Sequence, residues 1–260
     1  MAEELRGLEL FKSEVALVTG SASNIGKEIA IALSIQGAHI ILADVDGSKN
    51  QVTADEILGN GGSCDQVVVD LAQADGWKRL LPSIEGRLPS IYVHSACPPR
   101  VEHDTPLRVA AETFDEMLAV NVRSGFLIGR ELGRRMVEEE IGGRMLFITS
   151  LHAGSPRNLP HYSASKAGLT MVMKELARDL APHGVRVNAV APGALPGGGN
   201  TNITEEFGSR IPVRRVGSAA DIVGPSIALL ADCLCGYVTG ATLPVDGGLS
   251  LVNWIPFADQ

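Results

Sequence analysis

Short apolar runs alternate with helix-like segments along the chain, and this alternation limits the possible folds more than any other feature. The runs predicted to be strands are residues 15–19, 39–43, 67–69, 91–93, 145–149, 185–190 and 241–245. Helical patterns follow the first run and also cover residues 48–60, 112–137, 162–181 and 219–231. Apolar strands separated by amphipathic helices are typical of a parallel sheet covered by helices on both faces. We therefore predict a doubly wound α/β fold of about seven strands.

The chain has 260 residues, which fits a single domain over residues 1–260. Its least regular stretch is residues 194–217, where Pro196 precedes three glycines and few residues are apolar. A loop of this length inside a compact domain is usually a lid or a binding loop. We therefore expect this loop to determine the choice of substrate, with Leu195 among the residues that contact it.

Charge and composition narrow the possible partners. The formal net charge is −8 and no run of lysine or arginine occurs, so neither nucleic acid nor an anionic membrane is an expected partner. No apolar stretch of about eighteen residues predicts a membrane span. The four cysteines lack the spacing of zinc ligands, so we expect no metal site. The acidic first ten residues lack the apolar core of a signal peptide, which favours a reducing cytoplasm.

Tyr162 and Lys166 are the first candidates for chemistry. They are four residues apart and lie on one face of a predicted helix. An ammonium beside a phenol favours the phenolate, so Tyr162 is expected to give or take a proton at a substrate oxygen. Ser150, twelve residues before Tyr162, is expected to donate a hydrogen bond to the same oxygen, and His152 to line the substrate pocket. Alone, this spacing also fits an ordinary surface helix.

A glycine-rich loop joins the first predicted strand to the first predicted helix. It runs from Gly20 to Gly26, and Ser23, Asn24 and Ile25 lie within it. In open α/β sheets this position holds a dinucleotide pyrophosphate against the helix N-terminus, because glycines let the backbone approach the phosphates. Asn24 occupies a place where another glycine is expected. Asparagine tolerates a left-handed backbone; if none is needed here, Asn24 is an N-cap of the helix.

Asp44 ends the second predicted strand, 24 residues after Gly20. A carboxylate there can accept hydrogen bonds from the ribose hydroxyls of a dinucleotide and would repel a 2′-phosphate. No lysine or arginine between Gly20 and Gly26 would offset that repulsion. These facts favour NAD over NADP as the cofactor, although Asp44 could also be a solvated turn residue.

The other candidates also follow predicted strands. Asp70 follows the third, His94 and Ser95 the fourth, Ser150 the fifth, and Pro192 and Gly193 the sixth. Parallel strands place these ends at one edge of the sheet, which is where doubly wound folds bind their ligands. The sequence therefore predicts one crevice that contains the cofactor loop and the tyrosine.

Together these residues resemble the short-chain dehydrogenase/reductase family in its single-domain form, which has a Rossmann fold. The matching motifs are Thr19-Gly20 to Gly26, Asp70-Leu71, Val120-Asn121-Val122, Ser150 with Tyr162 and Lys166, Ala191-Pro192-Gly193, Val238-Thr239-Gly240 and Val245-Asp246-Gly247-Gly248. They span nearly the whole chain and keep the family's order, so chance coincidence is negligible.

The resemblance implies roles for residues that the spacing alone does not explain. Asn121 would complete the catalytic set by holding a water for a proton relay, although it could simply bond to helix backbone. The residues implied to contact the cofactor are Asp70 and Leu71 at the adenine, Ser95 and Ala96, Tyr162 and Lys166, and Pro192 and Gly193 at the nicotinamide. The family also implies a homo-oligomer, a tetramer or a dimer, with residues 112–137 and the tyrosine helix as pairing faces.

The chain departs from the family pattern after its fourth predicted strand. It has His94-Ser95-Ala96-Cys97 where the family usually has two asparagines, an alanine and a glycine. His94 and Ser95 can supply hydrogen bonds in place of the amides. Cys97 in place of glycine argues against a positive φ at that position.

The expected activity is an NAD-dependent hydride transfer between the nicotinamide and a secondary alcohol or ketone, for example a sugar or polyol, with Tyr162 as acid and base. One alternative is an NADPH-dependent reductase of 3-oxoacyl thioesters, against which Asp44 counts. Another is a non-catalytic dinucleotide sensor, against which the complete set of Asn121, Ser150, Tyr162 and Lys166 counts.

Overall fold

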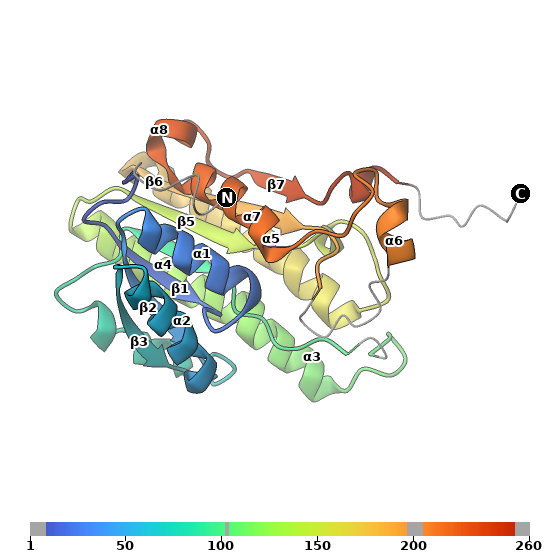
Figure 1. Cartoon of the computed structure of the whole chain (residues 1–260). Helices are drawn as coiled ribbons and strands as arrows, with labels where there is room; N and C mark the ends of the chain where they lie inside the picture. The colour runs from blue at the N-terminus through green and yellow to red at the C-terminus, as the bar shows by residue number, and fades with distance from the viewer. Residues whose placement is uncertain (1–8, 102–103, 197–204, 253–260) are drawn as a thin grey trace, which may run out of the picture.

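A parallel sheet of seven strands crosses the molecule in the order β3-β2-β1-β4-β5-β6-β7 (Figure 1). The computed structural model describes residues 9–101, 104–196 and 205–252. Its strands are β1 (Val15–Thr19), β2 (His39–Asp44), β3 (Ser63–Val68), β4 (Ile91–His94), β5 (Gly143–Ile148), β6 (Val185–Pro192) and β7 (Thr242–Val245). Every neighbouring pair is parallel. The predicted doubly wound fold is confirmed.

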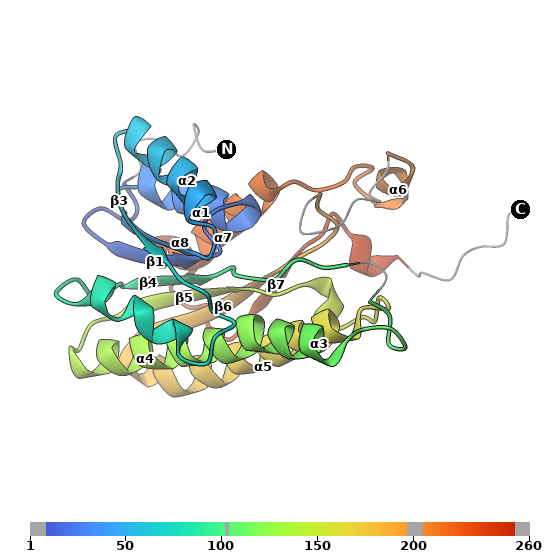
Figure 2. The ribbon, with the colours of Figure 1, turned by 90° about the horizontal axis from the view of Figure 1, so that it is seen from below.

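Helices cover both faces of the sheet (Figure 2). They are α1 (Asn24–Ile35), α2 (Gly47–Gly59), α3 (Ala111–Leu118), α4 (Gly125–Glu138), α5 (Pro160–Leu180), α6 (Glu205–Arg210), α7 (Ala219–Leu230) and α8 (Asp232–Cys235). Helices α1, α2 and α7 pack on one face, and α4 and α5 on the other. Among the described residues, no helix is both long and apolar enough to cross a membrane.

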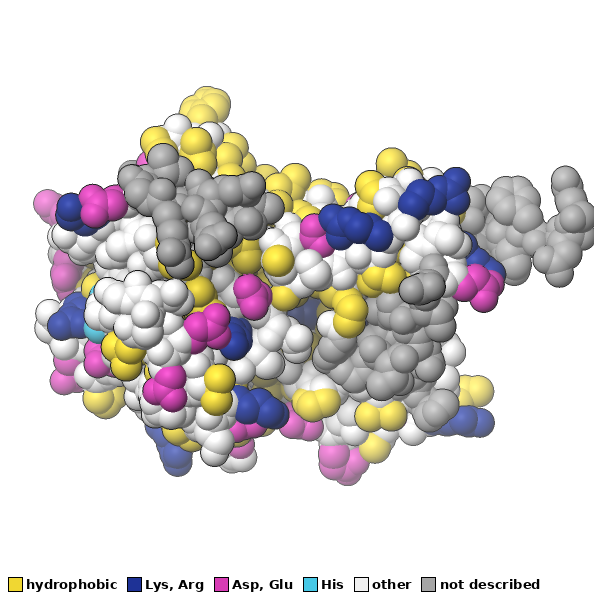
Figure 3. Space-filling view, in the orientation of Figure 1, with side chains coloured by type: hydrophobic (Ala, Val, Ile, Leu, Met, Phe, Trp, Pro, Cys, Tyr) yellow, Lys and Arg dark blue, Asp and Glu magenta, His cyan; other side chains and the backbone are white. Residues whose placement is uncertain are grey.

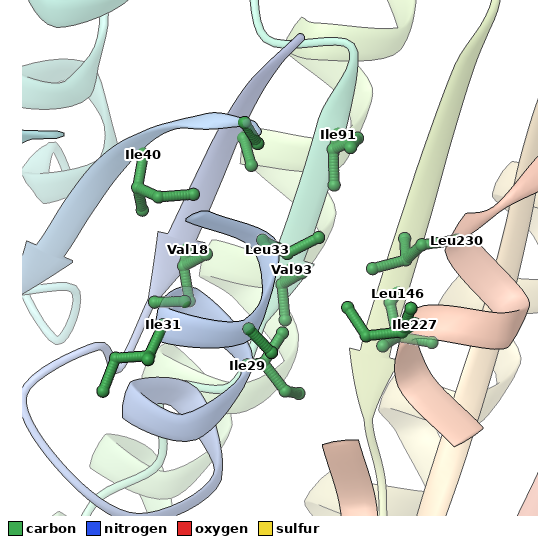
Figure 4. Close-up of a cluster of buried hydrophobic side chains, with 14 of the residues drawn as sticks. Val18, Ile29, Ile31, Leu33, Ile40, Ile91, Val93, Leu146, Ile227 and Leu230 are labelled. Atoms are coloured by element: carbon green, nitrogen blue, oxygen red, sulfur yellow. The ribbon is translucent and has the colours of Figure 1, made fainter. Parts of the chain in front are cut away.

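Alternating side chains of each central strand supply the two halves of the core. Val18 of β1 belongs to the same cluster as Ile29 and Leu33 of α1, whereas its neighbour Leu17 belongs to the cluster on the opposite face, which includes Leu132 of α4. Figure 4 shows the first cluster, in which side chains of β1, β2, β4 and β5 meet those of α1 and α7. Because both faces are buried, the central strands read as continuous apolar runs.

The strand order reverses direction beside β1. Chain order runs outward from β1 through β2 to β3, and then resumes on the other side of β1 with β4. Thr19, at the carboxyl end of β1, lies in register with Ala43 of β2 and with His94 of β4. Such a switch point leaves a crevice at the carboxyl edge of the sheet, because the loops on either side leave in opposite directions.

The third strand and the predicted loop differ from the sequence-based predictions. The third strand covers Ser63–Val68, not residues 67–69, because polar residues face solvent along this edge of the sheet and conceal the strand from an apolar search. Within residues 194–217, predicted as a loop, residues 205–210 form the short helix α6. Residues 197–204 of that loop lie outside the described residues.

The long helical stretch predicted over residues 112–137 is real but contains a widened turn. Helix α3 passes into α4 through Ala119–Ser124, which have π-helical hydrogen bonding. Asn121 lies in the middle of this turn and is fully buried. Widened turns of this kind are frequent at functional sites, because the extra residue redirects a side chain or frees a carbonyl.

Candidate active site

One cavity of about 900 Å³ opens at the carboxyl edge of the sheet, beside the switch point. Its lining includes most of the predicted site residues, which are Gly20, Ser23, Asn24, Ile25, Asp44, Asp70, Leu71, Ser95, Ala96, Ser150, His152, Tyr162, Lys166, Pro192, Gly193 and Leu195. Gly26 and Asn121 are buried and do not line it. The structure therefore brings residues from six strand ends to one cavity, as the sequence predicted.

The loop after β1 is shaped so that only glycine fits at two positions. A Cβ at Gly20, where φ is +71°, would lie 2.6 Å from the backbone nitrogen of Ala96, and a Cβ at Gly26 would lie 2.0 Å from the carbonyl oxygen of Gly20. Asn24 adopts the left-handed backbone that the sequence allowed it, with φ of 48°. The loop thus lies tightly against β4, with the first turn of α1 beside the cavity, and this arrangement fits a dinucleotide pyrophosphate.

Asp44 lies at the end of β2 with both carboxylate oxygens held in place. Oδ2 accepts a hydrogen bond from the backbone nitrogen of Ala22 at 3.0 Å, and Oδ1 accepts one from the backbone nitrogen of Asp46 at 3.0 Å. These bonds fix the carboxylate at the wall of the cavity. Lys49 also lines this end, and its ammonium pairs with Asp46 at 2.9 Å. Sequence reasoning, which looked for cations only within the glycine loop, missed Lys49.

Tyr162 and Lys166 lie one turn apart on α5 and are both buried. The helix begins at Pro160, whose fixed φ and missing N–H suit the first helical position. The ammonium of Lys166 lies 5.6 Å from the ring centroid of Tyr162 and donates a hydrogen bond to the carbonyl of Ile148 at 2.9 Å. This bond to β5 holds the long, flexible side chain near the tyrosine at the wall of the cavity.

Ser150 and His152 approach Tyr162 from the end of β5. The backbone nitrogen of His152 donates a hydrogen bond to Ser150 Oγ at 3.2 Å. The His152 ring meets the Tyr162 ring edge to face, with centroids 5.0 Å apart. Desolvation, together with smaller contributions from the positive charges of Arg100 and Arg157, lowers the pKa of His152 from 6.5 to about 4. His152 is therefore a neutral wall residue at neutral pH.

Asn121, which is buried and does not line the cavity, contacts α5. Its side-chain nitrogen donates to Ser165 Oγ at 2.8 Å and lies 3.2 Å from the sulfur of Met117. Ser165 Oγ in turn donates to the carbonyl of Tyr162 at 2.8 Å. The side-chain oxygen of Asn121 is buried without a protein partner. The structure thus links Asn121 to α5 through a serine side chain, not to its own helix backbone.

His94, at the end of β4, occupies the centre of a buried hydrogen-bond network. Its Nε2 lies 3.1 Å from the carbonyl oxygen of Asn121, so Nε2 carries the proton. Its Nδ1 is then the hydrogen-bond acceptor, and the hydroxyl oxygens of Tyr92 and Thr19 lie 2.9 and 3.0 Å from it. His94 therefore connects β1 and β4 to the widened turn at Asn121, and it supplies hydrogen bonds where the family uses an amide. Cys97, beyond it, has no positive φ, as the sequence indicated.

We expect His94 to make stability depend on pH. Desolvation, with a smaller contribution from Lys166, lowers its pKa from 6.5 to about 3. Below pH 6.5 this histidine is therefore protonated in the unfolded chain but stays neutral in the folded protein. The free energy of unfolding then decreases as the pH falls from 6.5 toward 3, by up to about 1.4 kcal/mol per pH unit. In urea unfolding between pH 7 and 4, His94→Asn should lose less stability than the unmodified protein.

A control separates this effect from general acid sensitivity. His183 is exposed, so His183→Asn should leave the pH dependence unchanged. An unchanged slope in His94→Asn would show that the buried ring is not responsible.

Sequence reasoning missed Arg100 and Arg157, which both line the cavity. The guanidinium carbon of Arg100 lies 4.6 Å from the ring centroid of Tyr162. Each arginine follows a proline in an irregular segment, where no periodicity indicates the direction of a side chain. Only the three-dimensional structure brings both of them to the cavity that contains the tyrosine.

Comparison with known proteins agrees with this geometry. Residues 20–250 match the family model described as enoyl-(acyl carrier protein) reductase. A (3R)-3-hydroxyacyl-CoA dehydrogenase of Rattus norvegicus is 32% identical over 266 residues, which cover 96% of this chain and 99% of that protein. A 3-oxoacyl-[acyl-carrier-protein] reductase of Synechocystis is 33% identical over 251 residues, with 91% and 97% covered.

A solved structure shows the same fold over nearly the full length. It is described as a candidate NAD(P)-dependent gluconate 5-dehydrogenase of Beutenbergia cavernae and contains bound NADP. It aligns with a TM-score of 0.87 at 30% identity and covers 95% of this chain and 100% of its own. A doubly wound sheet with this loop and this tyrosine–lysine pair defines a class of dinucleotide-dependent oxidoreductases. The chain belongs to the short-chain dehydrogenase/reductase family within that class and acts on CH–OH groups.

Proposed function

We propose that the protein is an NAD-dependent oxidoreductase that transfers a hydride between the nicotinamide and a secondary alcohol or ketone. One observation carries this proposal. Tyr162, Lys166 and Ser150 meet on the wall of a cavity that also contains the glycine loop and the Asp44 carboxylate. Oxidation of an alcohol needs a proton acceptor at the hydroxyl oxygen and a hydride acceptor at the carbon that bears it, and this cavity offers a place for each.

The side chains divide the proton chemistry among them. Tyr162 takes the hydroxyl proton in oxidation and returns it in reduction. Lys166 favours the negative charge that develops on the phenol, and Ser150 donates a hydrogen bond to the substrate oxygen. Asn121, through Ser165, holds α5 in position and offers its unpartnered oxygen to a relay water. When bound, the dinucleotide accepts the hydride from the alcohol carbon or supplies it to the ketone carbon.

The residues that would hold the dinucleotide follow the order of the strand ends. The backbone around Gly20 to Gly26 would bind the pyrophosphate, and Asp44 the adenosine ribose. Asp70 and Leu71 would lie at the adenine, and Pro192 and Gly193 at the nicotinamide. The tight backbone approach at Gly26 and the fixed Asp44 carboxylate both fit this assignment.

The fixed carboxylate of Asp44 supports NAD over NADP. A 2′-phosphate would meet a like charge that two backbone N–H groups hold in place, and like charges at contact are strongly unfavourable. We expect Asp44→Asn to raise kcat/KM with NADP relative to NAD by about tenfold or more. The same substitution at Asp46, whose carboxylate pairs with Lys49, is the matched control and should change the ratio much less. An equal ratio in both variants would reject Asp44 as the selecting group.

A reductase of 3-oxoacyl thioesters is the second candidate. The (3R)-3-hydroxyacyl-CoA dehydrogenase and the 3-oxoacyl-[acyl-carrier-protein] reductase described above favour it, since each is about a third identical to this chain. Asp44 argues against its NADPH-dependent form.

A spectrophotometric screen tests the function and separates the candidates. Cyclic alcohols, polyols, sugars, hydroxysteroids and 3-hydroxyacyl thioesters would each be offered with NAD and with NADP, and reduced coenzyme would be followed at 340 nm. Turnover of an alcohol or polyol with NAD supports the first candidate, and turnover of thioesters the second. Coenzyme binding without turnover of any compound would contradict both.

We also propose that the protein forms a homo-oligomer, a tetramer or a dimer. Phe126 of α4 and Met171 of α5 are exposed on the outer side of the helical layer, whereas Met173 is buried. Figure 3 shows further hydrophobic side chains gathered over α8, where Leu234 and Tyr237 are exposed. Light scattering at several concentrations measures the assembly.

The free thiols of all four cysteines fit the reducing cytoplasm, which we propose as the compartment of this protein.

A further inference from the structure

Two guanidinium groups lie in the wall of the cavity beside the acid/base tyrosine. Arg100 stacks over the Tyr162 ring, with its guanidinium carbon 4.6 Å from the ring centroid. Arg157 also lines the cavity, and the two arginines act together on His152, whose ring is 5.0 Å from that of Tyr162. Arg100, Arg157, His152 and Tyr162 therefore form one cluster, which we call the arginine cluster.

The charge of this cluster contrasts with the rest of the molecule. The chain carries a formal net charge of −8. Of the acids that line the cavity, Asp44 ends β2 and Asp46 and Asp70 follow β2 and β3, at the end that suits the adenosine. Beside Tyr162 the described lining residues carry three cations, Arg100, Arg157 and Lys166, against one acid, Glu116 of α3.

Guanidinium groups in the wall of a cavity suit one class of ligand group. Both arginines are partly buried, and desolvation lowers the pKa of Arg157. The oxygens of a carboxylate or a phosphate match the planar fork of a guanidinium with two parallel, charge-assisted hydrogen bonds, whereas a neutral alcohol forms no such pair.

Resting on the proposed oxidoreductase function, we propose that Arg100 and Arg157 bind an anionic oxygen group of the substrate, so that the substrate is a small hydroxy acid or a phosphorylated polyol. Because Arg100 lies over the ring of Tyr162, the anionic group sits within a few carbon atoms of the carbon that bears the reacting hydroxyl. The arginine cluster would then orient the substrate, with the anion on the guanidinium groups and the hydroxyl at Tyr162 and Ser150.

Binding to the protein saturated with NADH tests this without requiring turnover. The probes are D-gluconate, D-sorbitol 6-phosphate and D-sorbitol, which share a six-carbon chain and differ in the charged group, together with 3-hydroxybutyrate and 2-butanol. We expect at least one anionic probe to bind about tenfold or more tightly than its neutral partner in calorimetry. Comparing the affinities of the carboxylate probes with that of the phosphate probe then shows which anion the site prefers.

Substitution of the arginines assigns the preference to the cluster. In Arg100→Gln and in Arg157→Gln the preference for the anion should fall to about twofold or less, while the affinities for D-sorbitol and NADH stay unchanged. Arg157→Lys keeps the charge but not the fork, and it should retain part of the preference. The control is Arg130→Gln, because Arg130 also stacks on a ring, 5.5 Å from that of Phe126, but lies on α4 and does not line the cavity.

The outcomes separate this proposal from the oxidoreductase function on which it rests. Equal binding of anionic and neutral probes, or a preference that survives both glutamine variants, overturns the anion site. Turnover of neutral alcohols with no anion preference would overturn the anion site and leave the oxidoreductase function standing. Tight anion binding that the arginine variants abolish supports the site, even if the anionic probes are not oxidised.

Discussion

Tyr162→Phe is expected to lower kcat by about 10²–10⁴ while the protein keeps its coenzyme and its fold. The substitution removes one hydroxyl, which is the only part of this side chain able to accept or return the substrate proton. The ring stays, so its contacts with His152 and with the guanidinium of Arg100 are preserved. The loss should therefore appear in kcat, measured with the best substrate from the screen, and not in the dissociation constant of NADH.

Another tyrosine provides the control for this variant. Tyr237 is fully exposed and does not line the cavity, so Tyr237→Phe should have the kcat of the unmodified protein. Near-normal turnover by Tyr162→Phe would reject Tyr162 as the acid and base. A loss of NADH binding in that variant would instead indicate that the hydroxyl mainly holds the coenzyme.

The location of the cavity could be predicted from sequence because it follows from chain topology. Gly20, Asp44 and Ser150 each come directly after an apolar run, and parallel strands place such ends at one edge. No distance was needed for that inference. Local spacing also placed Tyr162 and Lys166 on one face of α5, because helix geometry fixes the positions of residues four apart.

Features that depend on contacts between distant residues were not predictable in this way. The sequence shows a histidine at position 94, but its partners are the Tyr92 hydroxyl and the carbonyl of Asn121, which reaches it from the widened turn between α3 and α4. Arg100 and Arg157 lie in irregular segments, whose side-chain directions follow no period. The edge strand β3 was shortened in the prediction because Ser63, Asp65 and Gln66 carry no apolar signal.

Gly26→Ala is expected to weaken the binding of NADH by about tenfold to a hundredfold and to lower stability by about 1–3 kcal/mol. The added Cβ would lie 2.0 Å from the carbonyl oxygen of Gly20 and 3.3 Å from Ser95 Oγ. The first of these atoms is backbone, so a side-chain rotation cannot relieve the clash. The start of α1 must move away from the loop, and the N–H groups that would bind the pyrophosphate move with it.

The test of this prediction compares two glycine-to-alanine variants. Gly59 ends α2, is exposed, and has no atom within 4 Å of the position of an added Cβ. Gly59→Ala should therefore keep NADH affinity and be as stable as the unmodified protein or slightly more so, since alanine favours the helix by about 1 kcal/mol. Fluorescence titration with NADH and thermal unfolding without coenzyme give the two readings. If Gly26→Ala bound NADH as well as Gly59→Ala does, the close approach between α1 and the loop would not be what forms the coenzyme site.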